Sequence, residues 1–194
     1  MKFVLRAIRG QAGFTLIEMV IVVAIIAAAA AMAISKADPH AAFAADAAAG
    51  EIARALRFAQ REAIRTGTYQ IINIDPGPQV LRIYRFTASG YVTTAHPVDK
   101  TDYQISFAKE GMTQATIVSS VFRYQDGAVT TTAMFGPDGL PVDVSLIKLL
   151  GLAPGKVLEP KDASALKEDG KITLRYGSNE RVVRVAPGTG RVSL

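Results

Sequence analysis

The apolar run from Phe14 to Ile34 constrains this chain more than any other feature. Its 21 residues would extend about 32 Å as an α-helix, and the hydrocarbon core of a bilayer is about 30 Å thick. Lys2, Arg6 and Arg9 precede the run without an acidic residue, which favours a cytoplasmic N-terminus and an exported C-terminal part. The pattern therefore predicts a membrane helix over residues 14–36.

Glu18 is the one charged residue in this run. An ionised group at the centre of a spanning helix costs roughly 2.5–3.5 kcal/mol, less near an end, so a partner is expected. Two simpler interpretations are a cleaved secretory signal, with small residues near Ala31 and over 42–45, and an uncleaved anchor. The run is longer than the ~7–15 apolar residues of a signal peptide, and Glu18 is unfavourable in either interpretation.

Cleavage between Gly13 and Phe14 would supply that partner. It would create an α-amine at the membrane depth of Glu18. An amine and a carboxylate about 4 Å apart attract each other by roughly 4 kcal/mol at an effective dielectric near 20. One helix end could then recruit a neighbouring chain.

A short basic leader ending in Gly13, followed by Phe14-Thr15-Leu16-Ile17-Glu18 and an apolar helix, resembles the class III signal of type IV pilins and pseudopilins. The resemblance implies that residues 1–13 are a leader that a prepilin peptidase removes. It also implies N-methylation of Phe14 and a role for Glu18, with Phe14, in subunit assembly. The implied location is the inner membrane, crossed once, with a periplasmic head that enters a pilus or pseudopilus.

Residues 37–67 continue as a predicted amphipathic helix, after a break that Pro39 favours at Asp38. Small and apolar residues recur there at three- and four-residue spacing, which is typical of a helix with one buried face. They are Ala45, Ala48, Ala49, Ile52, Leu56, Ala59 and Ala63. Thr66-Gly67 provides a C-terminal cap.

Residues 68–194 alternate short β-type runs with turns, which predicts seven or eight strands. The runs are Gln70 to Ile74, Val80 to Phe86, Gln104 to Phe107, Thr116 to Tyr124, Ala128 to Phe135, Lys171 to Tyr176, Arg181 to Val185 and Arg191 to Leu194. The expected fold class is α+β: a long N-terminal helix, membrane-spanning in its first half, packed on a C-terminal antiparallel β-sheet head of pilin-like type. An irregular insert near 140–168, with an apolar stretch over 146–152, could hold a short helix.

The segment Glu51 to Thr68 is similar to the helix end of minor pilins and pseudopilins of the GspH/FimT type. Stretches starting at Phe135, Lys171 and Arg181 look like the late strands of that family, whereas the insert departs from it. The resemblance implies a minor pseudopilin of a type II secretion system, a structural subunit whose partners are major and minor pseudopilins, prepilin peptidase and inner-membrane lipid. The alternatives are a minor pilin that binds DNA for uptake and a membrane-anchored periplasmic domain.

DNA binding would require cations that contact phosphates. The candidate residues are Arg175, Arg184 and Arg191. The DNA-binding branch of the family ends in Gly-Arg-x-Arg, whereas this chain has Ser193 in place of the second arginine. DNA is therefore the less favoured partner.

Catalysis has little support in the sequence. The chain has no cysteine, which excludes disulfides, a thiol nucleophile and a thiolate zinc site. His40 and His96 accompany no nucleophile motif, and the carboxylates lack calcium-loop spacing. We therefore expect no catalytic residues, metal or cofactor. The net charge of +5 would fall to +2 without the leader, so much of the basicity belongs to targeting.

Overall fold

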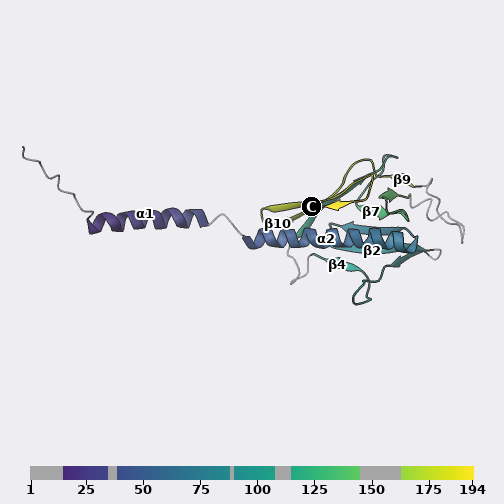
Figure 1. Cartoon of the computed structure of the whole chain (residues 1–194), viewed down its shortest axis with the longest axis horizontal. Coiled ribbons are helices and arrows are strands. Elements are labelled where there is room, and N and C mark those ends of the chain that lie inside the picture. The colour runs from purple at the N-terminus through teal and green to yellow at the C-terminus, as the bar shows by residue number, and fades with distance from the viewer. Residues whose placement is uncertain (1–14, 35–38, 88–89, 108–114, 145–162) are drawn as a thin grey trace, which may run out of the picture. The chain divides into compact units, whose positions relative to one another are not determined.

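The computed structural model of the protein describes residues 15–34, 39–87, 90–107, 115–144 and 163–194 (Figure 1). The chain divides into two compact units, Met1–Asp38 and Pro39–Leu194. The first contains helix α1 (Leu16–Ile34), and the second contains helix α2 (Pro39–Thr66) and all the described strands. The predicted leader, residues 1–13, and the predicted break at Asp38 lie outside the described residues.

Helix α1 is apolar on all sides. Its sequence contains one charged residue, Glu18, in its first turn. The described side chains of residues 15–30 are all exposed. A helix of this composition is stable in water only when other apolar groups cover it.

Helix α2 confirms the predicted amphipathic pattern. All seven predicted small and apolar residues of the stripe are at most 1% exposed. Pro39 is its first residue, where a missing N–H costs no hydrogen bond. Gly67 adopts a φ of 64° directly after Thr66, as the predicted C-terminal cap requires.

The described strands of the head form two five-stranded sheets and a two-stranded ribbon. Sheet 1 has the order β3-β2-β1-β7, with β4 also paired to β2, and sheet 2 has the order β12-β11-β10-β5-β6. Every strand pairing among the described residues is antiparallel. The strands of sheet 1 are β1 (Gln70–Asp75), β2 (Val80–Thr87), β3 (Gly90–Thr93), β4 (Gln104–Ser106) and β7 (Thr132–Phe135). Those of sheet 2 are β5 (Thr116–Arg123), β6 (Val129–Thr130), β10 (Gly170–Tyr176), β11 (Asn179–Val185) and β12 (Val192–Ser193).

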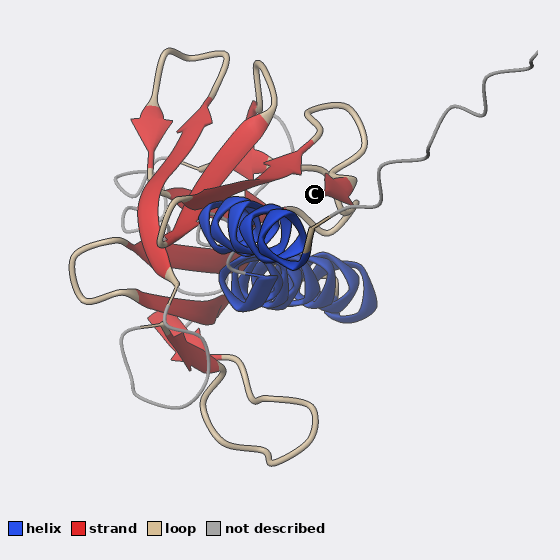
Figure 2. Ribbon diagram, turned by 90° about the vertical axis from the view of Figure 1, so that its left-hand side faces the viewer, coloured by secondary structure: helices blue, strands red, loops and turns tan. Residues whose placement is uncertain are grey.

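Both sheets pack on α2, and Figure 2 shows their strands as a curved layer beside the helix. Ile72 of β1 and Ile172 of β10 are fully buried in the same core as Ile52 and Leu56 of the helix. The predicted fold class, a helix packed on an antiparallel β-sheet head, is therefore confirmed, and the structure adds that two sheets contact the helix. Two sheets share one helix because alternate residues of β1 and of β10 both present apolar side chains to it.

The predicted strand Ala128 to Phe135 is divided in the structure. Its first part, β6, pairs with β5 in sheet 2, whereas β7 pairs with β1 in sheet 1. Thr131 lies between them, where the chain passes from one sheet to the other. Hydrophobic pattern alone does not show such a crossing, because the residues on both sides of it have strand character.

The predicted insert begins and ends in a short ribbon. Strand β8 (Val142–Asp143) pairs with β9 (Ser164–Ala165). The short helix expected over 146–152 lies outside the described residues. Strands β3, β8 and β9 were not predicted, so the head has more strands than the expected seven or eight.

Candidate functional site

The first candidate site is the beginning of α1, where the chain was predicted to be processed and to assemble. Gly13 and Phe14 lie outside the described residues, and Thr15 directly precedes the helix. The backbone N–H of Glu18 donates to Thr15 O (3.1 Å) and lies 3.4 Å from Thr15 Oγ1. Thr15 therefore caps the helix.

The capping role of Thr15 was missed at the sequence level. The signature Thr15-x-x-Glu18, a hydroxyl residue followed three positions later by a glutamate before an apolar run, would have identified it. The cap fixes the position of Glu18 in the first helical turn. A carboxylate there is stabilised by the positive end of the helix dipole.

The Glu18 side chain is exposed, and within the described residues it forms no ion pair. Its carboxylate can therefore accept a hydrogen bond from an amine of another chain. Leu16 and Ile17 beside it are 83% and 68% exposed. This combination of one carboxylate and uncovered apolar side chains suits association with other apolar helices.

None of the helices in the described parts of the chain is both long enough and apolar enough to cross a membrane. The predicted membrane segment, residues 14–36, extends beyond the described residues at both ends. Its membrane-spanning role stays a prediction.

The second candidate site comprises the arginines predicted as possible DNA contacts. Arg175 and Arg184 lie on the same face of sheet 2, because Arg175 pairs with Glu180 and Arg184 with Lys171 in the β10–β11 register. Arg191 directly precedes β12 and is exposed. The register thus brings Lys171 next to Arg184, a neighbour that the sequence spacing did not reveal.

The charges on this face are not all available. Arg175 Nη2 lies 3.5 Å from Glu180 Oε2, which offsets its charge. Arg181, near the same hairpin, forms an ion pair with Asp46 of α2. Arg184, Lys171 and Arg191 form no ion pair within the described residues. A polyanion could therefore reach these three cations.

Among the described residues, His96 lies next to one carboxylate. His96 Nδ1 lies 3.0 Å from Asp99 Oδ1 in a surface loop. The Thr101 hydroxyl donates to the same carboxylate and lowers the pKa of Asp99. No three potential metal ligands among His, Asp and Glu come together in the described ranges.

Comparison with known proteins agrees with the N-terminal geometry. Residues 8–34 match the prokaryotic N-terminal methylation motif, which confirms the predicted pilin-type segment. The chain matches none of the curated proteins. It is 19% identical to a solved structure of the minor pseudopilin EpsH from the type 2 secretion system of Vibrio cholerae, with 78% of this chain and 94% of that chain covered and a TM-score of 0.44. A crystal structure of the minor pseudopilin EpsH from the type II secretion system of Vibrio cholerae is also 19% identical. The match covers 79% of this chain and 96% of that chain, with a TM-score of 0.43.

Proposed function

We propose that this chain is a minor pseudopilin, a structural subunit of the periplasmic pseudopilus of a type II secretion system. The observation that carries the proposal is the exposed apolar helix α1, which begins at a Thr15–Glu18 cap inside an N-terminal methylation motif. The choice of type II secretion follows the resemblance of residues 51–68 to the GspH/FimT type. The subunit acts by assembly rather than by catalysis.

The proposed sequence of events starts with processing. A prepilin peptidase cleaves after Gly13, and Phe14 is N-methylated. Residues 14–36 anchor the subunit in the inner membrane, with the N-terminus cytoplasmic and the head periplasmic. Glu18 then pairs with the N-terminal amine of an adjacent subunit while apolar helices pack together. Repeated head-to-tail contacts of this kind generate an open helical filament.

The experiment that tests processing and pairing compares two variants expressed with the other subunits. Gly13→Ala should leave the precursor at full mass, because the peptidase site is lost. Glu18→Gln should be processed at the normal rate but enter filaments poorly, since the amide keeps the shape and loses the charge. Intact mass and the amount of subunit in sheared filaments are the measurements.

The matched control is Glu51→Gln on α2, whose carboxylate contacts Arg54 of the same helix. It should be processed and incorporated normally. Normal incorporation of Glu18→Gln would contradict the pairing mechanism. An N-terminus at Met1, or one beyond Ala37, would contradict the pilin class itself.

The second candidate function is DNA binding during uptake, and the adjacent Lys171 and Arg184 on sheet 2 favour it. Binding should weaken as salt rises, by about 0.9 logarithmic units of affinity per logarithmic unit of salt for each phosphate contacted. Arg184→Gln should reduce the slope of this salt dependence by about 0.9, the amount expected for one phosphate contact. Arg175→Gln, whose charge Glu180 already offsets, should change it less. No binding of duplex DNA by the full chain at low salt would reject this candidate.

A further inference from the structure

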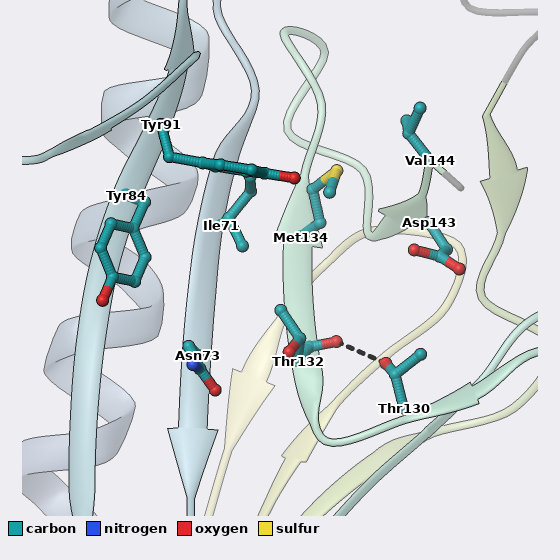
Figure 3. Close-up of a pocket in the computed structure, with 9 residues that line it drawn as sticks. All are labelled: Ile71, Asn73, Tyr84, Tyr91, Thr130, Thr132, Met134, Asp143 and Val144. Carbon is teal, nitrogen blue, oxygen red and sulfur yellow. Dashed lines mark hydrogen bonds between the residues drawn. The ribbon is translucent and has the colours of Figure 1, made fainter. Parts of the chain in front are cut away.

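A pocket lies on the face of sheet 1 that is turned away from α2 (Figure 3). Along β1, Ile72 and Ile74 point into the core with α2, so Ile71 and Asn73 point to the opposite face. Ile71 and Met134, on the adjacent strand β7, form an apolar floor and are almost fully buried. The pocket has a volume of about 400 Å³, within the range of natural ligand sites.

The walls of the pocket differ in chemistry. Tyr84 of β2 and Tyr91 of β3 lie on one side, and Tyr91 is 43% exposed. Asp143 of β8 lies on the other side, and in Figure 3 its carboxylate is turned toward Met134. Tyr91 packs edge-on against Phe86 at a ring distance of 5.5 Å, which holds its ring in place.

Polar groups line the lower part of the pocket in Figure 3. They belong to Asn73, Thr130 and Thr132. The Thr130 hydroxyl donates to the Thr132 carbonyl at 2.8 Å. These groups offer hydrogen-bond acceptors beside the apolar floor.

Asp143 brings a negative charge to this pocket. Its half-buried position raises the pKa of the carboxyl, and the nearby charge of Asp126 raises the pKa further. Within the described residues, no basic side chain lines the pocket and Asp143 forms no ion pair. Because burial of an unpaired charge is unfavourable, a cation that enters the pocket would be stabilised there.

We propose that this pocket binds an arginine side chain presented by another protein. The carboxylate of Asp143 matches the planar guanidinium, which also stacks well on tyrosine rings. Ile71 and Met134 provide an apolar surface for the methylene groups of the same side chain. The inference concerns the head alone and does not depend on filament assembly.

The experiment follows Met134, which lies on the pocket floor, in the full chain solubilised in detergent micelles. The chain has five methionines, so ¹³C-methyl labelling gives few signals, and Met134→Leu assigns the one that matters. The probe is Nα-acetyl-arginine amide, and the control probe is Nα-acetyl-citrulline amide, which has nearly the same shape without the charge. The arginine probe should shift the Met134 signal saturably, and the citrulline probe should not.

Variants then test the named groups. Asp143→Asn should weaken binding of the arginine probe by about tenfold or more, and Tyr91→Leu should weaken its binding several-fold. Asp169→Asn, at an exposed carboxylate outside the pocket, should leave affinity unchanged. Because Asp143→Asn is isosteric, an unperturbed Met134 signal without probe shows that the pocket is intact.

Four results with the intact segment 145–162 would overturn the inference. They are an unsaturable Met134 response, an equal response to citrulline, equal weakening by Asp169→Asn, and tighter binding of spermidine, which would assign the pocket to a free polyamine. Binding that appears only after residues 145–162 are replaced by a Gly-Ser linker would also overturn the inference. It would mean that the chain itself, and not another protein, fills the pocket in the original protein. If only Asp143→Asn and Tyr91→Leu weaken binding of the arginine probe, the inference is supported.

Discussion

Helices α1 and α2 belong to the same chain but obtain their stability in opposite ways. Every described side chain of α1 is exposed, whereas α2 buries one complete face, from Ala45 to Ala63, against two sheets. The partners of α2 are therefore inside the head, whereas no contact within its own unit covers the described side chains of α1. The comparison separates residues that determine folding from residues that determine assembly.

Truncation of one leucine in each helix should give the largest difference. Leu56 is fully buried, so Leu56→Ala should lower the free energy of unfolding by about 2–5 kcal/mol. Leu16 is 83% exposed, so Leu16→Ala should leave unfolding of the head unchanged. Urea unfolding followed by circular dichroism in one detergent measures both. Similar losses for the two variants would show that α1 is part of the folded head.

A glycine pair tests how closely α2 contacts the turn before β12. Gly190 has a φ of 64°, and a Cβ there would lie 2.5 Å from Gln60 Nε2 and 2.6 Å from the Gly139 carbonyl oxygen. Gly190→Ala should therefore cost about 1–3 kcal/mol of stability. Gly188 has no atom within 4 Å of an added Cβ, so Gly188→Ala should change stability by less than about 0.5 kcal/mol. Thermal unfolding compares them, and equal effects would reject the close packing of this turn.

The cap of α1 should have a smaller effect, confined to that helix. Thr15→Ala removes the acceptor at 3.4 Å from the Glu18 amide and should cost about 1 kcal/mol of helix stability. Amide exchange at Glu18 in micelles should become faster, while exchange in β1 stays the same. Thr15→Ser keeps the hydroxyl and should behave like the original chain. Unchanged exchange in Thr15→Ala would mean that the surrounding apolar medium alone holds the first turn.

The smallest expected effect is a pH dependence at the end of α2. Arg65 donates to both oxygens of Glu62 (2.6 and 2.8 Å) and lowers the pKa of that carboxyl. A lowered folded-state pKa stabilises the protein above the unfolded pKa near 4.5, and this contribution is lost as the pH falls below it. Glu62→Gln should thus lower the melting temperature slightly at pH 7 and not at pH 3. A loss of equal size at both pH values would show that the effect comes from packing.

Much of the architecture could be predicted where one short segment contains the whole signal. The α2 stripe follows from the 3.6-residue period, because one turn places Ile52 and Leu56 on the same side. The cap at Thr66-Gly67 was predicted as well, and Gly67 has a φ of 64°. The N-terminal motif lies within one continuous segment, and residues 8–34 match the prokaryotic N-terminal methylation motif.

The pocket could not be predicted in the same way. Asp143 lies in β8 and Tyr91 in β3, and neither strand was predicted. They come from segments about fifty positions apart, which meet only after β3, β2, β1 and β7 have paired. The same holds for Lys171 and Arg184, which are neighbours only in the β10–β11 register.

The sequence alone determined the helical periods, the turn positions and the N-terminal motif, because these depend on residues a few positions apart. The tertiary structure decided that β6 and β7 join different sheets, that both sheets share α2, and which charges lie together on a surface. Those results depend on long-range pairing and on competition for one helix face. No local pattern encodes that competition, since Thr130 and Thr132 are the same type of residue and still lie in strands of different sheets.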